Sequence, residues 1–180
     1  MSLSSELTNA WNSRGKKTTP LGTAKSAKWF SDYIKKNIGN TSLSQLKHEG
    51  TAVTKFKPGM LVTYLYDAKH KDTLPVWDAF PLVLVTSVDA RSWKGINLHY
   101  IPPAHRIKII VALLKAGEST KTELGSLRAI QTVLGAVSTA YAPFTKMYLF
   151  DHIASPAINI HRSFFEMVIS LPFAQFNYNK

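Results

Sequence analysis

The side chains best suited to catalysis fall in one loop. Three carboxylates and one imidazole occur within twelve residues, at Asp67, His70, Asp72 and Asp78. A metal-dependent nuclease needs carboxylate and imidazole ligands that converge on a divalent ion. The spacing matches no loop of fixed ligand geometry, and two lysines, Lys69 and Lys71, interrupt it. Short Asp side chains in loops commonly bond to nearby backbone. We therefore favour a turn-forming role, and keep a nuclease using Asp67, Asp72 and Asp78 as an alternative.

Other catalytic signatures are missing from the sequence. The six histidines form no HxxxH or HExxH pair, and neither a GxSxG elbow nor a nucleotide-binding glycine loop occurs. His99 and His105 flank Pro102-Pro103, where we expect them to hydrogen-bond the end of a strand to the start of a helix. The chain has no cysteine, which excludes disulfides and thiolate metal sites. We predict a protein that is not an enzyme and needs no cofactor, metal or small-molecule substrate.

Aromatic residues surround the same loop, at Trp77, Phe80, Trp93 and Tyr100. Aromatic rings among basic residues can stack on unpaired bases. The alternative is that Trp77 and Phe80 close one end of a sheet, since aromatic side chains dominate small cores. We favour the second interpretation and keep both residues as candidates for contact with a protein partner.

The chain is strongly basic, with a formal net charge of +11 over 180 residues. Residues 1–60 hold ten Lys or Arg against three acids, so most of the excess lies there. Basic arms commonly bind polyanions, above all nucleic acid, although solubility or an acidic protein neighbour would explain the charge equally well. No apolar run is long enough to span a bilayer, and no apolar signal-peptide core follows the first residues. We expect no membrane contact.

Residues 1–25 are rich in Ser, Thr, Lys and Asn and should be a flexible arm when alone. Leu3, Leu7 and Trp11 are spaced four apart, which predicts one apolar stripe on a helix formed against a partner. We expect residues 26–180 to form a single domain. It begins with a helix over 27–38, which Ser26 caps and Gly39 ends.

A compact β unit follows over residues 56–101. Alternation predicts a strand over 60–66, and a near-continuous apolar run predicts a buried strand over 82–88. The loop 67–81 separates these strands. After a turn over 89–95, a third strand is expected over 96–100, with Asn97 and His99 on the face opposite Ile96.

The remaining residues predict a helical segment over 103–151 and two C-terminal strands within 157–172. Pro102-Pro103 opens a helix that ends at Gly117, and Thr120 with Glu123 resembles a capping box for a helix to residue 134. Leu124 and Leu127 are expected to face inward on it. A short helix is predicted over 143–150, and strands over 158–160 and 167–171. The element order predicts the α+β class, as a small antiparallel sheet or partly open β-barrel packed by several helices.

The β unit also resembles a known family. Its segments FKPGMLVTYLYD, LPVWDAFPLVLV and GINLHY, with the weaker ISLP near the C-terminus, are similar to virion proteins of T-even-like contractile-tailed phages, including DNA end protector proteins. The resemblance implies a non-catalytic virion component, assembled in the host cytoplasm, that sits in the head or neck and shields the ends of packaged duplex DNA. In that role seven cations of the N-terminal region would contact phosphates without reading sequence. These are Arg14, Lys16, Lys17, Lys25, Lys28, Lys35 and Lys36.

The resemblance also allows an assembly protein of the tail, baseplate or neck that contacts only neighbouring subunits. The arm and the aromatic tail would then order along adjacent proteins. The candidate partner-binding residues are Leu3, Leu7, Trp11, Trp77, Phe80, Phe173, Phe176 and Tyr178.

Overall fold

The described part of the chain folds as a sheet with helices on one side. The computed structural model describes residues 52–70, 72–73, 77–78, 81–119, 121–161 and 165–170. The strands are β1 (Ala52–Val53), β2 (Leu61–Thr63), β3 (Leu82–Val88), β4 (Ser92–Asn97), β5 (Thr145–Leu149) and β6 (Ala157–Asn159). The helices are α4 (Pro103–Glu118), α5 (Glu123–Ala140) and α6 (Phe165–Ser170), with 3-10 turns η1 (Leu98–Tyr100), η2 (Ala142–Phe144) and η3 (Phe150–His152). The helix expected over 27–38 lies outside the described residues.

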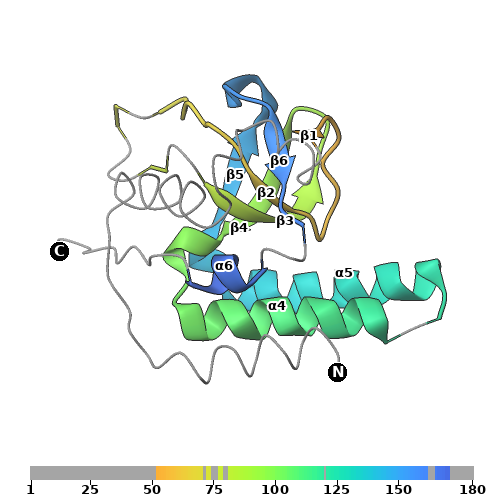
Figure 1. Ribbon diagram of the computed structural model, residues 1–180. Coiled ribbons are helices and arrows are strands. Elements are labelled where there is room, and N and C mark those ends of the chain that lie inside the picture. Colours follow the sequence, from red (N-terminus) through yellow and green to blue (C-terminus); the bar gives the residue numbers. More distant parts are fainter. Residues whose placement is uncertain are drawn as a thin grey trace, which may run out of the picture.

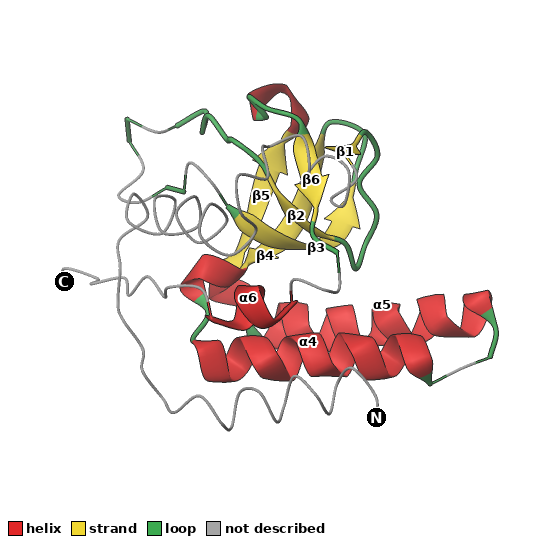
Figure 2. Ribbon diagram, viewed as in Figure 1, coloured by secondary structure: helices red, strands yellow, loops and turns green. Residues whose placement is uncertain are grey.

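The sheet is antiparallel throughout, with strand order β1-β6-β2-β3-β4-β5. Strands β1 and β5 form its two edges, so the sheet is open and does not close into a barrel. Figure 1 shows α4, α5 and α6 together below the sheet, and Figure 2 shows the same separation of helices from strands. This arrangement confirms the predicted α+β class and the antiparallel sheet.

The two faces of the sheet have different cores. Leu82 and Leu84 of β3 face a cluster of aliphatic side chains from α4, α5 and α6. Val83 and Val85, on the opposite face, join an aromatic cluster that contains Trp93 and the tyrosines 64, 66 and 148. Residues 82–85 are continuously apolar because both faces of β3 are buried there, as the sequence predicted. Ser87 and Val88 at the end of the strand are exposed, contrary to the prediction of a strand buried over its whole length.

Gly95 in β4 lets the strands approach closely. A Cβ at this position would clash with Cγ1 of Val83 and lie 2.7 Å from the backbone oxygen of Leu84. Gly59 has a positive φ of 90° in the turn before β2, a conformation that glycine adopts without steric cost. The two glycines therefore fix the shape of the β unit.

The third strand of the β unit is not where the sequence placed it. Strand β4 runs over Ser92–Asn97, and residues 98–100 form η1. The strand ends because the Asn97 side chain accepts a hydrogen bond from the His99 N–H at 3.0 Å and so starts a 3-10 turn. The polar residues Ser92 and Lys94 alternate with buried Trp93, a pattern that the turn prediction over 89–95 overlooked.

Two further secondary-structure predictions were wrong. Residues 145–149 form β5 and not a helix, because Pro143 starts only the single turn η2 and Tyr148 then pairs with Trp93 of β4. Residues 165–170 form α6 and not a strand. Short apolar runs do not distinguish the two states, and packing against α4 decides this one.

Helices α4 and α5 form an antiparallel hairpin. Pro103 begins α4, as predicted, but the helix passes through Gly117 to Glu118. The side chain of Thr122 caps α5 by accepting from the Gly125 N–H at 3.2 Å, so the expected capping box at Thr120 is not the cap. Helix α5 continues to Ala140, six residues past the predicted end. No helix among the described residues is long and apolar enough to cross a bilayer.

A buried arginine joins the helices. Arg106 is fully buried, and its Nε–H donates to the Ile101 carbonyl at 2.7 Å while Nη1 donates to the Val168 carbonyl of α6 at 3.3 Å. Burial lowers the pKa of Arg106 to about 9, which leaves the guanidinium charged at neutral pH. The side chain therefore ties the start of α4 to α6.

Candidate functional site

Most of the predicted site residues lie outside the described part of the chain. This applies to the seven cations of the N-terminal region, to Leu3, Leu7 and Trp11, and to Phe80, Phe173, Phe176 and Tyr178. Their roles stay predictions. Trp77 is described: it is half-buried and packs against the aromatic cluster, as expected if it closes one end of the sheet. Trp93 and Tyr100 are 0% and 3% exposed, so neither ring is available to stack on a base.

Asp78 belongs to a buried polar trio rather than to a metal site. Its Oδ2 accepts from Nδ2 of Asn97 at 2.9 Å and lies 2.8 Å from Nδ1 of His99. All three side chains are buried. The trio therefore fastens Asp78 to the end of β4.

The other candidate ligands of that loop differ from Asp78 in burial. Asp67, His70 and Asp72 are exposed, and the backbone of His70 takes part in a turn with Thr73. The described residues contain no group of three His, Cys, Asp or Glu side chains able to hold a metal ion. The loop therefore gives the nuclease alternative no support.

His99 and His105 have structural partners that differ from those predicted. His99 bonds to Asp78, whereas Nδ1 of His105 lies 2.9 Å from the Tyr141 hydroxyl and so joins α4 to the end of α5. The two histidines do not bridge to each other.

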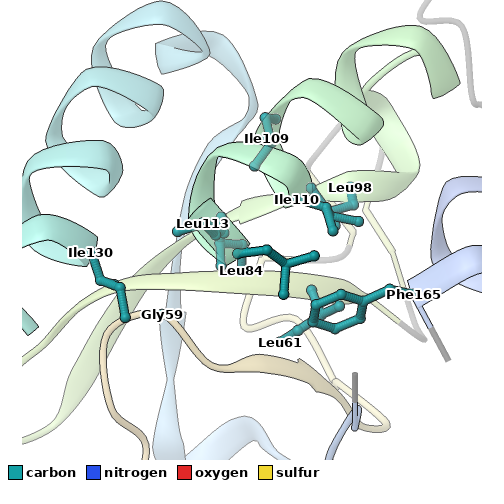
Figure 3. Close-up of a pocket in the computed structure, with 10 residues that line it drawn as sticks. Gly59, Leu61, Leu84, Leu98, Ile109, Ile110, Leu113, Ile130 and Phe165 are labelled. Atoms are coloured by element: carbon teal, nitrogen blue, oxygen red, sulfur yellow. The ribbon is translucent and has the colours of Figure 1, made fainter. Parts of the chain in front are cut away.

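A cavity between the sheet and the helices is apolar. It has a volume of about 90 Å³ and lies between the sheet and helices α4, α5 and α6. Figure 3 shows it lined by aliphatic side chains, Phe165 and Gly59. Because no polar side chain lines it, the cavity has no groups that could position a polar substrate.

The opposite face of the sheet carries a stack of aromatic rings. Phe56 stacks on Trp93 with ring centroids 4.8 Å apart, and Trp93 stacks on Tyr148 at 4.7 Å. Phe150 lies 5.4 Å from Phe56, and both phenylalanines are only half-buried. Trp93 and Tyr148 are thus interior, and Phe56 and Phe150 form the outer layer of the stack.

Cations accompany this outer layer. Lys55 and Lys57 flank Phe56 in the chain, and Arg91 lies beside Phe150, whose N–H donates to the Arg91 carbonyl at 3.2 Å. All three basic side chains are exposed. We call Phe56, Phe150, Lys55, Lys57 and Arg91 the aromatic rim. Sequence reasoning missed it, although the alternation of cation and ring in Lys55-Phe56-Lys57 is a signal that could have pointed to it.

The buried tyrosines behind the rim stay protonated. Burial raises the pKa of Tyr64, Tyr100 and Tyr148 well above its usual value, and the charge of Asp78 adds to the effect on each. Among the described residues the Tyr64 hydroxyl and the Trp93 indole nitrogen have no hydrogen-bond partner. Ring packing therefore holds much of this cluster together.

Two leucines on α5 are exposed, contrary to the prediction that they face inward. Leu124 is 61% and Leu127 is 49% exposed, whereas Leu134 further along the helix is buried. Figure 1 shows the reason: the end of the α4–α5 hairpin that carries them lies beyond the sheet, so the sheet cannot cover it.

Comparison with known proteins finds a family that spans almost the whole chain. The family model described as phage T4 terminal DNA protecting protein matches residues 4–180. No curated protein matches the chain. No solved structure matches it either.

Proposed function

The chain belongs to the phage T4 terminal DNA protecting protein family, and from this premise we propose that it binds the ends of packaged duplex DNA and shields them from nucleases. In this proposal the protein is a non-catalytic part of the virion, placed in the head or neck where DNA ends lie. Charge is the observation that supports the proposal: a net +11, concentrated in residues 1–60, favours a polyanionic partner.

The basic N-terminal region supplies the phosphate contacts in this proposal. If its seven cations all neutralise phosphates, the logarithm of the affinity should fall with the logarithm of salt concentration with a slope of about −6. Phosphate contacts carry no sequence information, so duplexes of different sequence should bind equally well.

Exonuclease protection tests the proposal. Linear duplex should be digested more slowly in the presence of the protein, while cleavage of circular duplex by an endonuclease should be little changed. A Lys16→Glu, Lys17→Glu variant should lose protection, and Lys108→Glu, Lys115→Glu, an equivalent charge change at two exposed positions on α4, should keep it. Digestion at the rate of naked DNA, or no duplex binding at low salt, would reject the proposal.

The exposed leucines favour a second candidate, attachment to a neighbouring virion protein. The side chains of Leu124 and Leu127 are largely exposed. Exposed apolar side chains that lie together can mark a contact with another protein. A Leu124→Ser, Leu127→Ser variant should fold normally and fail to enter particles. Incorporation at the wild-type level would reject this surface as the attachment point.

A further inference from the structure

A protein that guards DNA ends needs a contact that exists only at an end. Phosphates run along the whole duplex, so a basic arm binds the interior as well as it binds a terminus. The exposed face of the last base pair is found only at the end. Resting on the proposed function, we propose that the aromatic rim is the site that receives the terminal base pair of the duplex.

The rings of the rim suit the chemistry of that base pair. An unstacked base pair presents a flat, apolar π-face, and aromatic side chains stack on such faces whatever the sequence. Phe56 and Phe150 lie 5.4 Å apart at the outer layer of the stack and are half-buried. Their planes are tilted by 51° to each other, so one ring can stack flat on a base while the other contacts the pair at an angle.

The surface behind the rings is rigid. Phe56 rests on Trp93, which is fully buried and stacks in turn on Tyr148. Gly95 permits the close approach of β3 and β4 beneath these rings. A preformed platform loses little conformational entropy when it binds, which favours affinity.

The charges around the rings suit the phosphates next to a terminal base pair. Lys55, Lys57 and Arg91 are exposed and come from two segments that meet at the rim. Two exposed carboxylates, Asp89 and Asp151, lie in the adjoining turns. These carboxylates lie close in the chain to Arg91 and Phe150, whereas the lysines flank Phe56, so phosphates should approach from the side of the lysines.

The test uses the full-length protein and a short blunt duplex carrying 2-aminopurine in its terminal or its central base pair. Stacking of the terminal base on the rim should change fluorescence only for the terminal label. Phe150→Leu keeps an apolar side chain but removes the ring, and should weaken binding to blunt ends about fivefold or more. The matched control is Phe144→Leu, a half-buried ring that packs on the opposite face of the sheet.

Charge variants keep the test valid if ring variants fail to fold. Lys57→Glu and Arg91→Glu change exposed side chains, and each should reduce the preference for linear over covalently closed duplex, while Asp89→Asn should increase it. If the protein binds and protects DNA but none of these variants alters end preference, the inference is overturned and the proposed function stands. If the wild-type protein binds no duplex, both fail.

Discussion

Alkaline pH should unfold this protein, because three tyrosines are buried beside a charged carboxylate. Burial raises the pKa of Tyr64, Tyr100 and Tyr148 above that of an exposed tyrosine, and the Asp78 charge acts in the same direction. A pKa that is higher in the folded state means that the unfolded chain releases the proton first as pH rises. The stabilisation is therefore complete below about pH 10 and is lost above it.

The size of the effect follows from proton linkage. Each buried tyrosine should reduce the free energy of unfolding by about 1.4 kcal/mol per pH unit above about pH 10, so three give about 4 kcal/mol. Arg106 opposes them, because burial lowers its pKa to about 9 and the unfolded chain holds that proton longer. Arg106 therefore raises the free energy of unfolding by about 1.4 kcal/mol per pH unit, which leaves a net loss of about 3 kcal/mol per pH unit.

Guanidinium unfolding followed by circular dichroism between pH 8 and 11.5 measures this slope. Tyr148→Phe should make it shallower by about 1.4 kcal/mol per pH unit. Tyr141→Phe is the control: burial raises the pKa of Tyr141 as well, but this side chain is only half-buried at the end of α5, so the variant should keep most of the wild-type slope. Equal stability at pH 8 and 11.5, or an unchanged slope in Tyr148→Phe, would refute the assignment of these tyrosines.

Four other substitutions probe the fold by chemical unfolding, and the last of them also by hydrogen exchange. Gly95→Ala should lower the free energy of unfolding by about 2–3 kcal/mol through overpacking, whereas Gly135→Ala, with nothing within 4 Å of the new Cβ, should raise it by about 0.5–1 kcal/mol; equal effects would contradict the packing at β4. Asp78→Asn should cost about 2–4 kcal/mol, because it removes a buried charge that Asn97 and His99 bond; a neutral result would argue against the trio. Arg106→Met should cost a similar amount and speed hydrogen exchange in α6, and exchange that is unchanged there would show that the arginine does not hold this helix.

The elements that the sequence predicted well have strong local signals. Strand β3 begins with four consecutive buried apolar residues, and α4 begins at a proline pair and keeps one buried stripe. The predictions for residues 145–149 and 165–170 were wrong because the local signals there are ambiguous. Packing against elements distant in sequence decides the secondary structure of both segments. Pro143 by itself predicts a helix start, yet pairing with β4 holds the chain extended.

The sites were harder to predict than the elements. The contact of Asp78 with His99 joins residues 21 apart in sequence, and no local pattern encodes it. The aromatic rim joins three segments: the antiparallel pairing of β4 with β5 brings those near residues 91 and 150 together, and Phe56 packs against Phe150 from the third. Leu124 and Leu127 fit the helical period of the apolar stripe on α5. That period gives only the direction of a side chain and not whether another element reaches it.

On a long genome, recognition of an end depends on the number of competing internal sites as well as on the chemistry of the contact. On a duplex of about 100,000 base pairs, an end must be preferred over the interior by about 7 kcal/mol to be occupied as often as all internal sites together. Stacking on the two bases of a terminal pair provides about 2–6 kcal/mol, so the rim alone leaves a shortfall of about 1–5 kcal/mol. Attachment of Leu124 and Leu127 to a neighbouring protein would cover it by raising the effective concentration near the end.

Experiments on DNA of different lengths should therefore distinguish the role of the aromatic rim from that of Leu124 and Leu127. On a short duplex, where ends are common, the Leu124→Ser, Leu127→Ser variant should protect as well as the wild type, because the rim suffices. In assembled particles the same variant should leave the ends open to exonuclease even though its rim is intact. If the variant also fails to protect a short duplex, the leucines act through folding or DNA contact and not through attachment. The separate roles assigned to the aromatic rim and to the leucines would then be wrong.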